Sequence, residues 1–382
     1  MTDFAAYRAE FPVVRERTYL ISASLGPLSN RARAAALEHL DLWGRLGPEE
    51  LWFDHGLPKV AQCRELFARL IGADPDETAV VPSVSVGLSQ VATCLDFSRR
   101  PKVVLTDMDF PTNHYVWRAA ERAGAKVEVV TSRDGVTVPA EDVIARIDDQ
   151  TAAVNLNRVL FESSWIMDAP AIVEAAHRHG ALAVVDDFHG SGVLPIDVHE
   201  LGADVLLTGA LKWLCGGQGL AFLYCRRDLI EKMEPLVVGW FGTKDFFGFD
   251  RTSLRLRDDA RRFETGTLTL PQAWTAAAGL EIVLEVGVDA IRRRNRQLTE
   301  GIVARADDAG IEVRSPRDAS RRGGLVRLGI PGGPSRAKEI LHALFERDVV
   351  LDVRGDAVRV SPHFFNDEDD LDRCFAGLRE LL

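Results

Sequence analysis

Short apolar runs alternate with amphipathic stretches between about residues 75 and 225, and this alternation leaves few possible folds. Apolar runs rich in Val, Leu and Ala, separated by helical segments, are typical of a parallel sheet buried on both faces. The runs expected to form strands are Val103–Thr106, Val127–Val130, Ala152–Asn155, Leu182–Asp186, Asp204–Thr208 and Leu220–Cys225. The segments expected to form helices are 113–123, 139–147, 169–179 and, before the sheet, Pro58–Ile71. The pattern predicts an α/β fold.

The pattern changes after about residue 255, where helices come first and short strands follow. The helices expected there are Ala273–Val286, Asp289–Ala306 and Glu368–Leu382, and the strands are Gly324–Leu328, Val349–Asp352 and Ala357–Ser361. A length of 382 residues is enough for two domains. We therefore expect an N-terminal arm and large domain over residues 1–255 and a small α+β domain over residues 256–382.

Charge and cysteine content narrow the function classes. The net charge of −11 argues against a nucleic-acid partner, because phosphate backbones attract basic surfaces. The five cysteines are scattered without a C-x-x-C pair, which indicates neither a disulfide framework nor a zinc site. The sequence shows no signal peptide and no apolar run of membrane-spanning length, so we expect no membrane association. These observations predict a cytoplasmic protein that acts on a small molecule.

Two neighbouring predicted strands end in residues that carry chemistry. Asp186 ends the strand LAVVD, and Lys212 follows the next strand among mostly uncharged residues. Only seven of the 46 basic residues are lysines, so a lysine in an apolar context needs a reason. Desolvation lowers the pKa of a lysine, and a Schiff-base lysine near a carboxylate is what pyridoxal phosphate requires. Without further evidence, these two residues are equally consistent with structural roles, in which Lys212 is an ordinary lysine at a strand end and Asp186 caps a turn.

A turn rich in hydroxyl groups offers a phosphate site. The segment Ser83-Val84-Ser85 opens an amphipathic stretch, and a helix N-terminus of this kind attracts anions. A plain serine cap would give the same pattern. The glycine motifs of dinucleotide-binding and P-loop proteins do not occur. Asp186, Asp187 and His189 lack a fourth metal ligand nearby, so no metal site is expected.

Six motifs in this order resemble fold-type I pyridoxal-phosphate enzymes, in the class V aminotransferase family and its kynureninase-like branch. They are Asp109-Phe110-Pro111-Thr112-Asn113, Asp186-x-x-His189, Leu211-Lys212-Trp213-Leu214, Gly239-Trp240-Phe241-Gly242, Phe263-x-x-Gly266-Thr267 and the segment from Arg359 to Asn366. The resemblance covers nearly the whole chain. It implies an aspartate-aminotransferase-like fold, in which the large domain has three layers around a mainly parallel sheet. It also implies a homodimer with an active site shared between subunits.

The resemblance assigns roles by matched position. Lys212 and Asp186 would be catalytic: Lys212 would form the internal aldimine with pyridoxal 5′-phosphate, and Asp186 would pair with the pyridinium nitrogen and stabilise a quinonoid intermediate. Arg359 would bind the α-carboxylate of an amino-acid substrate. The cofactor-binding residues that it implies are Val84, Ser85, Phe110, Asn113, Asp186, His189, Lys212, Trp240 and Thr267.

Those roles differ from residue to residue. Val84 and Ser85 would hold the phosphate, to which Trp240 would donate its indole N–H, and Thr267 would approach from the neighbouring subunit. Phe110 would stack on the ring, and Asn113 would lie near the phenolic oxygen. His189 would support the cofactor only.

Kynureninases similar to this chain carry Tyr where Leu211 stands, His where Thr243 stands and Asp where Asn113 stands. Leucine cannot supply general acid-base help. We therefore expect a lyase-type reaction at Cβ, a β-elimination such as C–S cleavage. A kynureninase-type Cβ–Cγ hydrolase, an aminotransferase and a non-catalytic binding protein remain alternatives. Segments expected to set specificity are Ser22–Gly26, Leu51–His55 and Phe246–Phe249.

Overall fold

A seven-stranded mixed sheet forms the centre of the computed structural model, which describes residues 2–382. Its strands are β2 (Thr78–Val81), β3 (Lys102–Thr106), β4 (Lys126–Val130), β5 (Thr151–Asn157), β6 (Leu182–Asp186), β7 (Val205–Gly209) and β8 (Ala221–Cys225). Their spatial order is β2-β8-β7-β6-β5-β3-β4. Strand β8 runs antiparallel to both of its neighbours, and the other pairs are parallel. The expected mainly parallel sheet is confirmed.

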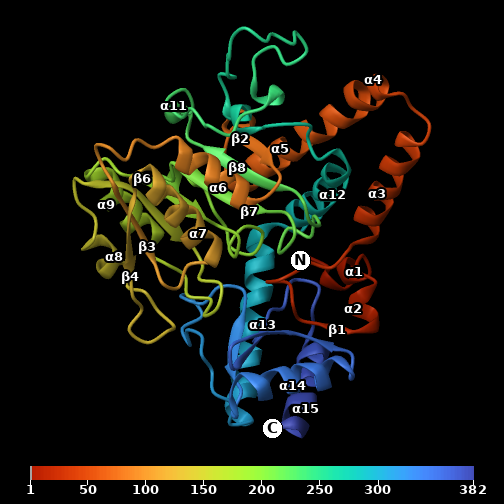
Figure 1. Cartoon of the computed structure of the whole chain (residues 1–382). Coiled ribbons are helices and arrows are strands. Elements are labelled where there is room, and N and C mark those ends of the chain that lie inside the picture. Colours follow the sequence, from red (N-terminus) through yellow and green to blue (C-terminus); the bar gives the residue numbers. More distant parts are fainter. Residues whose placement is uncertain (1) are drawn as a thin grey trace.

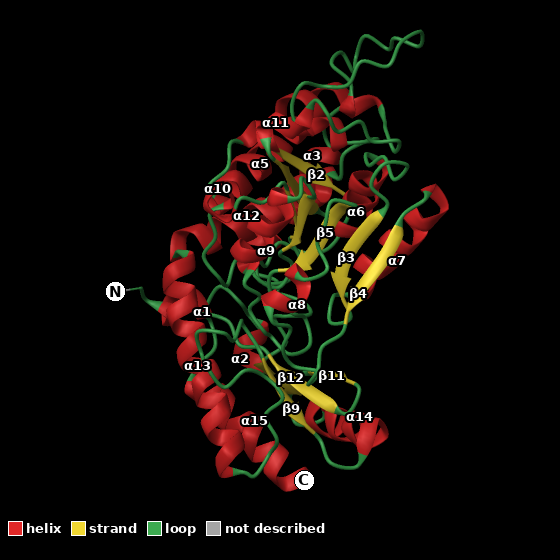
Figure 2. Cartoon of the chain, turned by 90° about the vertical axis from the view of Figure 1, so that its left-hand side faces the viewer, coloured by secondary structure: helices red, strands yellow, loops and turns green. Residues whose placement is uncertain are grey.

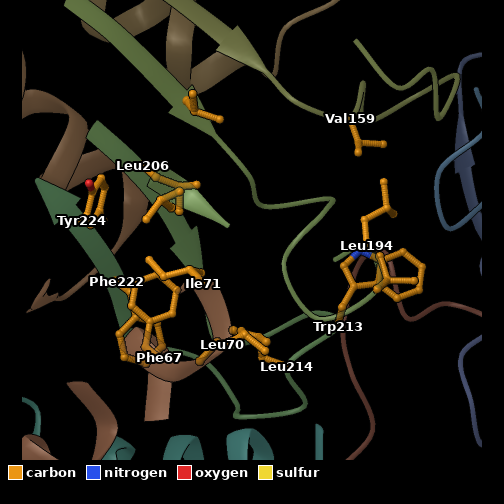
Figure 3. Packing of buried hydrophobic residues seen from close by; sticks show 14 of the residues in the cluster. Phe67, Leu70, Ile71, Val159, Leu194, Leu206, Trp213, Leu214, Phe222 and Tyr224 are labelled. Carbon is orange, nitrogen blue, oxygen red and sulfur yellow. The ribbon is translucent and has the colours of Figure 1, made fainter. Parts of the chain in front are cut away.

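Helices cover both faces of this sheet and complete three layers (Figures 1 and 2). Successive side chains of a strand point to opposite faces, and in β3 Val104 belongs to one buried cluster while Val103 and Leu105 belong to the other. The first cluster includes the stacked rings of Phe67 and Phe222, 4.5 Å apart (Figure 3). The helices against the sheet are α5 (Leu57–Ile71), α6 (Val84–Thr93), α7 (Pro111–Ala120), α8 (Ala140–Ile144) and α9 (Ala169–Arg178).

The long helix α13 (Val288–Asp308) leads from the large sheet to a second, smaller sheet (Figure 1). That sheet has the antiparallel order β11-β12-β9, with β9 (Val326–Gly329), β11 (Asp352–Arg354) and β12 (Ala357–Val360). Helices α13, α14 (Gly333–Phe345) and α15 (Glu368–Leu381) enclose a separate buried cluster with it.

The N-terminal segment returns to the C-terminal part of the chain. Strand β1 (Thr18–Tyr19) pairs in parallel with β10 (Val349–Val350), and an isolated bridge joins Ile21 to Ser361. This pairing brings the segment 22–26 to the strand that carries Arg359. The remaining helices are α1 (Phe4–Arg8), α2 (Val13–Glu16), α3 (Asn30–Trp43), α4 (Pro48–Glu50), α10 (Val198–Leu201), α11 (Arg227–Ile230) and α12 (Leu270–Val286).

The structure corrects three details of the expected elements. Strand β2 was not expected, because Pro82 ends its short apolar run after four residues. The strand predicted over Val349–Asp352 is divided, since β10 pairs with β1 whereas β11 pairs with β12. The helix predicted over 139–147 ends at Ile144. Within residues 2–382, no helix is both long enough and apolar enough to cross a membrane.

Candidate active site

Lys212 lies in the loop after β7, between anchored neighbours. The next residue, Trp213, is fully buried, and Figure 3 shows its ring beside Leu194. On the other side of the loop, the Gly26 N–H donates to the carbonyl oxygen of Leu211 at 2.7 Å. A Cβ on Gly26 would lie 2.2 Å from the carbonyl oxygen of Lys212, so only glycine allows this approach. Lys212 is therefore held by packing on both sides of its backbone.

The Lys212 amine contacts an imidazole and an aromatic ring. Its Nζ lies 2.8 Å from His189 Nε2 and 4.1 Å from the centre of the Phe188 ring. Desolvation lowers the pKa of Lys212 to about 7, although the negative charge of Asp186 opposes this shift. Near neutral pH a large share of the amine is therefore uncharged and able to accept a proton.

Asp186 ends β6 with its carboxylate buried. Its Oδ1 accepts from the Phe188 N–H at 3.0 Å, and its Oδ2 accepts from Asn113 Nδ2 at 3.2 Å. Burial raises the pKa of Asp186, while these hydrogen bonds and the charge of Lys212 lower it. Within residues 2–382 no salt bridge includes this carboxylate. A buried acceptor of this kind is suited to a cationic N–H group.

His189 and Asn113 each keep one buried polar atom free. Neither His189 Nδ1 nor Asn113 Oδ1 has a hydrogen-bond partner among the described residues. Burial, together with the charge of Lys212, lowers the pKa of His189 well below its ordinary value. The ring is therefore neutral at physiological pH. Both atoms are available to a polar ligand beside Lys212.

Arg359 lies on β12 and is almost completely buried. Its Nε donates to Asp352 Oδ1 at 2.8 Å, and its Nη2 donates to Ser24 Oγ at 2.8 Å. Its Nη1 donates to the carbonyl oxygen of Phe161, whose ring packs edge-on against Phe110. The predicted substrate-binding arginine is thus brought to the Lys212 cluster, but it is already paired.

The predicted phosphate turn is the N-terminus of α6. Ser83 caps the helix by accepting the Val86 N–H at 3.2 Å. The Ser85 side chain is exposed, and its hydroxyl lies 3.3 Å from Thr112 Oγ1, at the start of α7. The first N–H groups of a helix have no partner within the helix. Val84 and Ser85 therefore offer such groups on the side of the sheet where Phe110 and Asn113 begin α7.

The Trp240 and Thr267 motifs lie together, and Thr267 lines a small cavity with Pro82, next to the predicted phosphate turn. The Phe241 N–H donates to the Thr265 carbonyl oxygen at 3.2 Å, which joins the two motifs. No hydrogen bond within the described chain connects Trp240 or Thr267 to Lys212, Ser85 or Asp186. The Trp240 ring instead packs against Phe241 and Phe249. Their role as cofactor-binding residues stays a prediction.

Comparison with known proteins identifies the family. The profile of aminotransferase class-V matches residues 57–373. The chain belongs to the class V aminotransferase family. It is 34% identical over 365 residues to the uncharacterized aminotransferase YcbU of Bacillus subtilis, with 96% of this chain and 94% of YcbU covered. It is 29% identical over 376 residues to the kynureninase of Geobacillus thermodenitrificans, covering 93% of this chain and 86% of that enzyme.

Solved structures share the fold of this class V enzyme. The cystine C–S lyase C-DES in complex with cysteine persulfide has a TM-score of 0.89 at 22% identity, covering 97% of this chain and 99% of C-DES. The cysteine desulfurase of Thermococcus onnurineus has a TM-score of 0.87 at 22% identity, covering 98% of this chain and 96% of that chain. These likenesses confirm the pyridoxal-phosphate fold type I, and the family confirms a pyridoxal-phosphate-dependent enzyme.

The residues at the site fit this cofactor. The buried carboxylate of Asp186, which forms no salt bridge among the described residues, suits a protonated ring nitrogen, and the free Asn113 Oδ1 and His189 Nδ1 suit polar ring substituents. The N-terminus of α6 suits a phosphate. The Lys212 amine, with its lowered pKa, suits Schiff-base chemistry.

Four residues at the site were not predicted individually. Phe188 contacts Lys212 Nζ and could have been found, since it stands between Asp186 and His189. Ser24 lay within a segment expected to set specificity, but without a role. Asp352 and Arg354 gave no signal in the sequence, because only the pairing of β11 with β12 brings them to Arg359.

Proposed function

We propose that this pyridoxal-phosphate-dependent enzyme catalyses a β-elimination on an α-amino acid, with cleavage of a C–S bond as the preferred reaction. The cofactor, when bound, draws electrons from the substrate Cα and so makes its proton removable. The remaining steps depend on the residues of this chain.

The observation that carries the proposal is the composition of the site around the Lys212 amine. Lys212 has a pKa near 7, and the residue before it, Leu211, has no group that can move a proton. Within residues 2–382, His189 is the titratable group in hydrogen-bond contact with Nζ. A single amine with a neutral imidazole beside it is sufficient for proton transfer at Cα. Hydrolysis of a Cβ–Cγ bond would need an additional acid-base group that leucine cannot replace.

The bonds broken and the protons moved in this elimination are accounted for by Lys212, the leaving thiol and one water molecule. Lys212 removes the Cα proton, the bond between Cβ and sulfur breaks, and the thiol leaves with a proton. Addition of water to the remaining three-carbon unit gives pyruvate and ammonia. Arg359 holds the α-carboxylate, and Asp186 provides a fixed negative charge at the far end of the site. Structural likeness to a cystine C–S lyase supports the choice of bond, and sequence similarity to kynureninase supports chemistry at the side-chain carbons.

The test is to incubate the holoenzyme with S-substituted cysteines and to measure pyruvate and ammonia. Equal amounts of both, lost in Lys212→Ala but kept in Lys232→Ala at an exposed lysine, would support the proposal. Anthranilate and alanine from kynurenine would show a hydrolase instead. Keto acid that forms only with an amino acceptor would show an aminotransferase, and no turnover of any substrate would favour a binding protein.

We further propose a cytoplasmic homodimer with shared active sites, in which Thr267 serves the partner's cofactor site. The five free cysteines support a reducing compartment. The exposed side chains Leu236 and Phe249 near Trp240 support contact with a second copy. Mixing Lys212→Ala protein with an inactive variant at Thr267, such as Thr267→Arg, tests the shared site. Because one mixed dimer retains one intact site, about a quarter of wild-type activity should return with random exchange; no recovery despite exchange would contradict it.

A further inference from the structure

The guanidinium of Arg359 has few donors left for a substrate. Asp352 accepts from both Nε and Nη2, Ser24 Oγ accepts from Nη2, and the Phe161 carbonyl oxygen accepts from Nη1. A guanidinium carries five N–H groups, so one remains. A carboxylate bound in bidentate fashion needs two. Arg359 alone therefore cannot bind an α-carboxylate bidentately unless it gives up a contact.

Arg354 stands beside this pair with its donors mostly free. Its Nη2 lies 3.6 Å from Asp352 Oδ2, the same oxygen that accepts from Arg359 Nη2. Its one hydrogen bond within residues 2–382 goes from Nη1 to the neighbouring Val353 carbonyl oxygen, at 2.9 Å. The side chain is 41% exposed. Most of the N–H groups of Arg354 thus have no acceptor within the described chain, and its side chain is open to solvent beside the Asp352–Arg359 pair.

The register of the small sheet fixes this arrangement. Asp352 on β11 pairs directly with Arg359 on β12, and Arg354 is two residues further along β11. Residues two apart on a strand share a face. All three side chains therefore lie on one face of the hairpin, which closes through Gly355 at φ +59°.

The positive charges of Arg354 and Arg359 agree with a role at the site. The positive charges of Arg359 and Arg354 both lower the pKa values of Lys212 and His189, so both guanidinium groups act on the Lys212 cluster. Two guanidinium groups and the Asp352 carboxylate leave one net positive charge. One net positive charge matches one carboxylate.

We propose that Arg354 is a second carboxylate-binding residue, which shares the α-carboxylate of the substrate with Arg359. Asp352 is the positioning residue that holds the two guanidinium groups on one face. The inference rests on the proposed function in assuming an amino-acid substrate, and it specifies that one monoanionic carboxylate is bound by two arginines.

Binding of propionate to the holoenzyme tests this without turnover. Calorimetry gives its dissociation constant, and uncharged propionamide is the matched probe. Arg354→Gln should weaken propionate binding by about 10- to 100-fold, since a hydrogen bond to a charged group is lost. Arg354→Lys should weaken it by about 3-fold or more, because lysine lacks the planar fork. With the natural substrate, KM should rise by a similar factor, whereas kcat should change by less than about 3-fold.

Arg347→Gln is the matched control. Arg347 lies in the turn after α14, is 44% exposed, lies 3.6 Å from Glu380 and donates Nη1 to the Ala343 carbonyl oxygen at 2.9 Å. It should leave propionate binding unchanged. Wild-type propionate affinity in Arg354→Gln would overturn the inference; should that variant not fold, wild-type affinity in Arg354→Lys would do so. Arginine-dependent propionate binding without pyruvate formation would refute the proposed reaction and leave this inference standing.

Discussion

Mild acid is expected to destabilise the fold at the buried ring of His363, which contacts the segment that carries Lys212. His363 Nε2 lies 2.9 Å from the Trp213 carbonyl oxygen, and Nδ1 is buried without a partner among residues 2–382. Because the carbonyl oxygen accepts, Nε2 carries the proton of the neutral ring. A second proton would go to Nδ1, which lies among the rings of Trp213, Phe364 and Phe365.

Burial lowers the pKa of His363 from 6.5 to about 4. Between these two values the unfolded chain binds more protons than the folded one, so the free energy of unfolding falls as the pH falls. Above pH 6.5 the ring is uncharged in both states, and the contribution of His363 to the free energy of unfolding is fully present. This contribution is lost as the pH drops from 6.5 toward 4. The loss amounts to about 2 kcal/mol at pH 5 and about 3 kcal/mol near pH 4.

The comparison of wild type with His363→Gln isolates this contribution. Glutamine can still donate to the Trp213 carbonyl oxygen, but it does not titrate. Urea unfolding of both holoenzymes at about pH 7.5 and about pH 5 gives the difference in stability at each pH. Any advantage of wild type should shrink by about 2 kcal/mol at the lower pH. A difference that is the same at both pH values would refute the argument.

Three further substitutions test the Lys212 cluster. Lys212→Ala should abolish the visible absorbance of the bound cofactor, and a persisting band would show that another amine holds it. Asp186→Asn keeps the side-chain shape but removes the buried charge, so kcat should fall by about 100-fold with the fold intact by circular dichroism; unchanged kcat would contradict its role. Gly26→Ala places a Cβ 2.2 Å from the Lys212 carbonyl oxygen and should cost about 1–3 kcal/mol in urea unfolding. Gly47→Ala, where nothing lies within 4 Å of the added Cβ, is its control, and equal stability of the two variants would contradict the steric argument.

Local patterns in the sequence were sufficient for most of the large sheet. Continuous apolar runs placed β3 to β8 within about two residues, because all of these strands but the edge strand β4 are largely buried on both faces and bounded by polar turns. The direction of β8 was not predictable in the same way. Strand direction depends on which edge receives the chain after the Lys212 loop, and no local pattern encodes that choice. Helices α3 and α14 were missed; α3 gives little apolar signal, because only Ala32 and His39 of its residues are buried.

The residues of the site also differ in how far local sequence patterns could predict their positions. Asp186, His189 and Lys212 follow neighbouring parallel strands, whose carboxyl ends meet at one edge of the sheet, so the sequence was enough to predict that they lie together. The structure confirms this proximity with the 2.8 Å contact between His189 and Lys212. Their catalytic and cofactor-binding roles stay predictions. Trp240 and Thr267 were placed by resemblance alone, and within residues 2–382 neither forms a hydrogen bond with Lys212.

The substrate end of the site depends on pairing across long sequence separations. Ser24 reaches Arg359 because β1 pairs with β10, and Asp352 reaches it because β11 pairs with β12. A slip of one residue in the second pairing would turn Asp352 to the opposite face and leave Arg359 buried without a counter-charge. The register of a three-residue strand therefore determines both the stability of this arginine and the number of donors that a carboxylate meets. A motif that contains Arg359 identifies the residue, but its free donors are set by residues outside the motif.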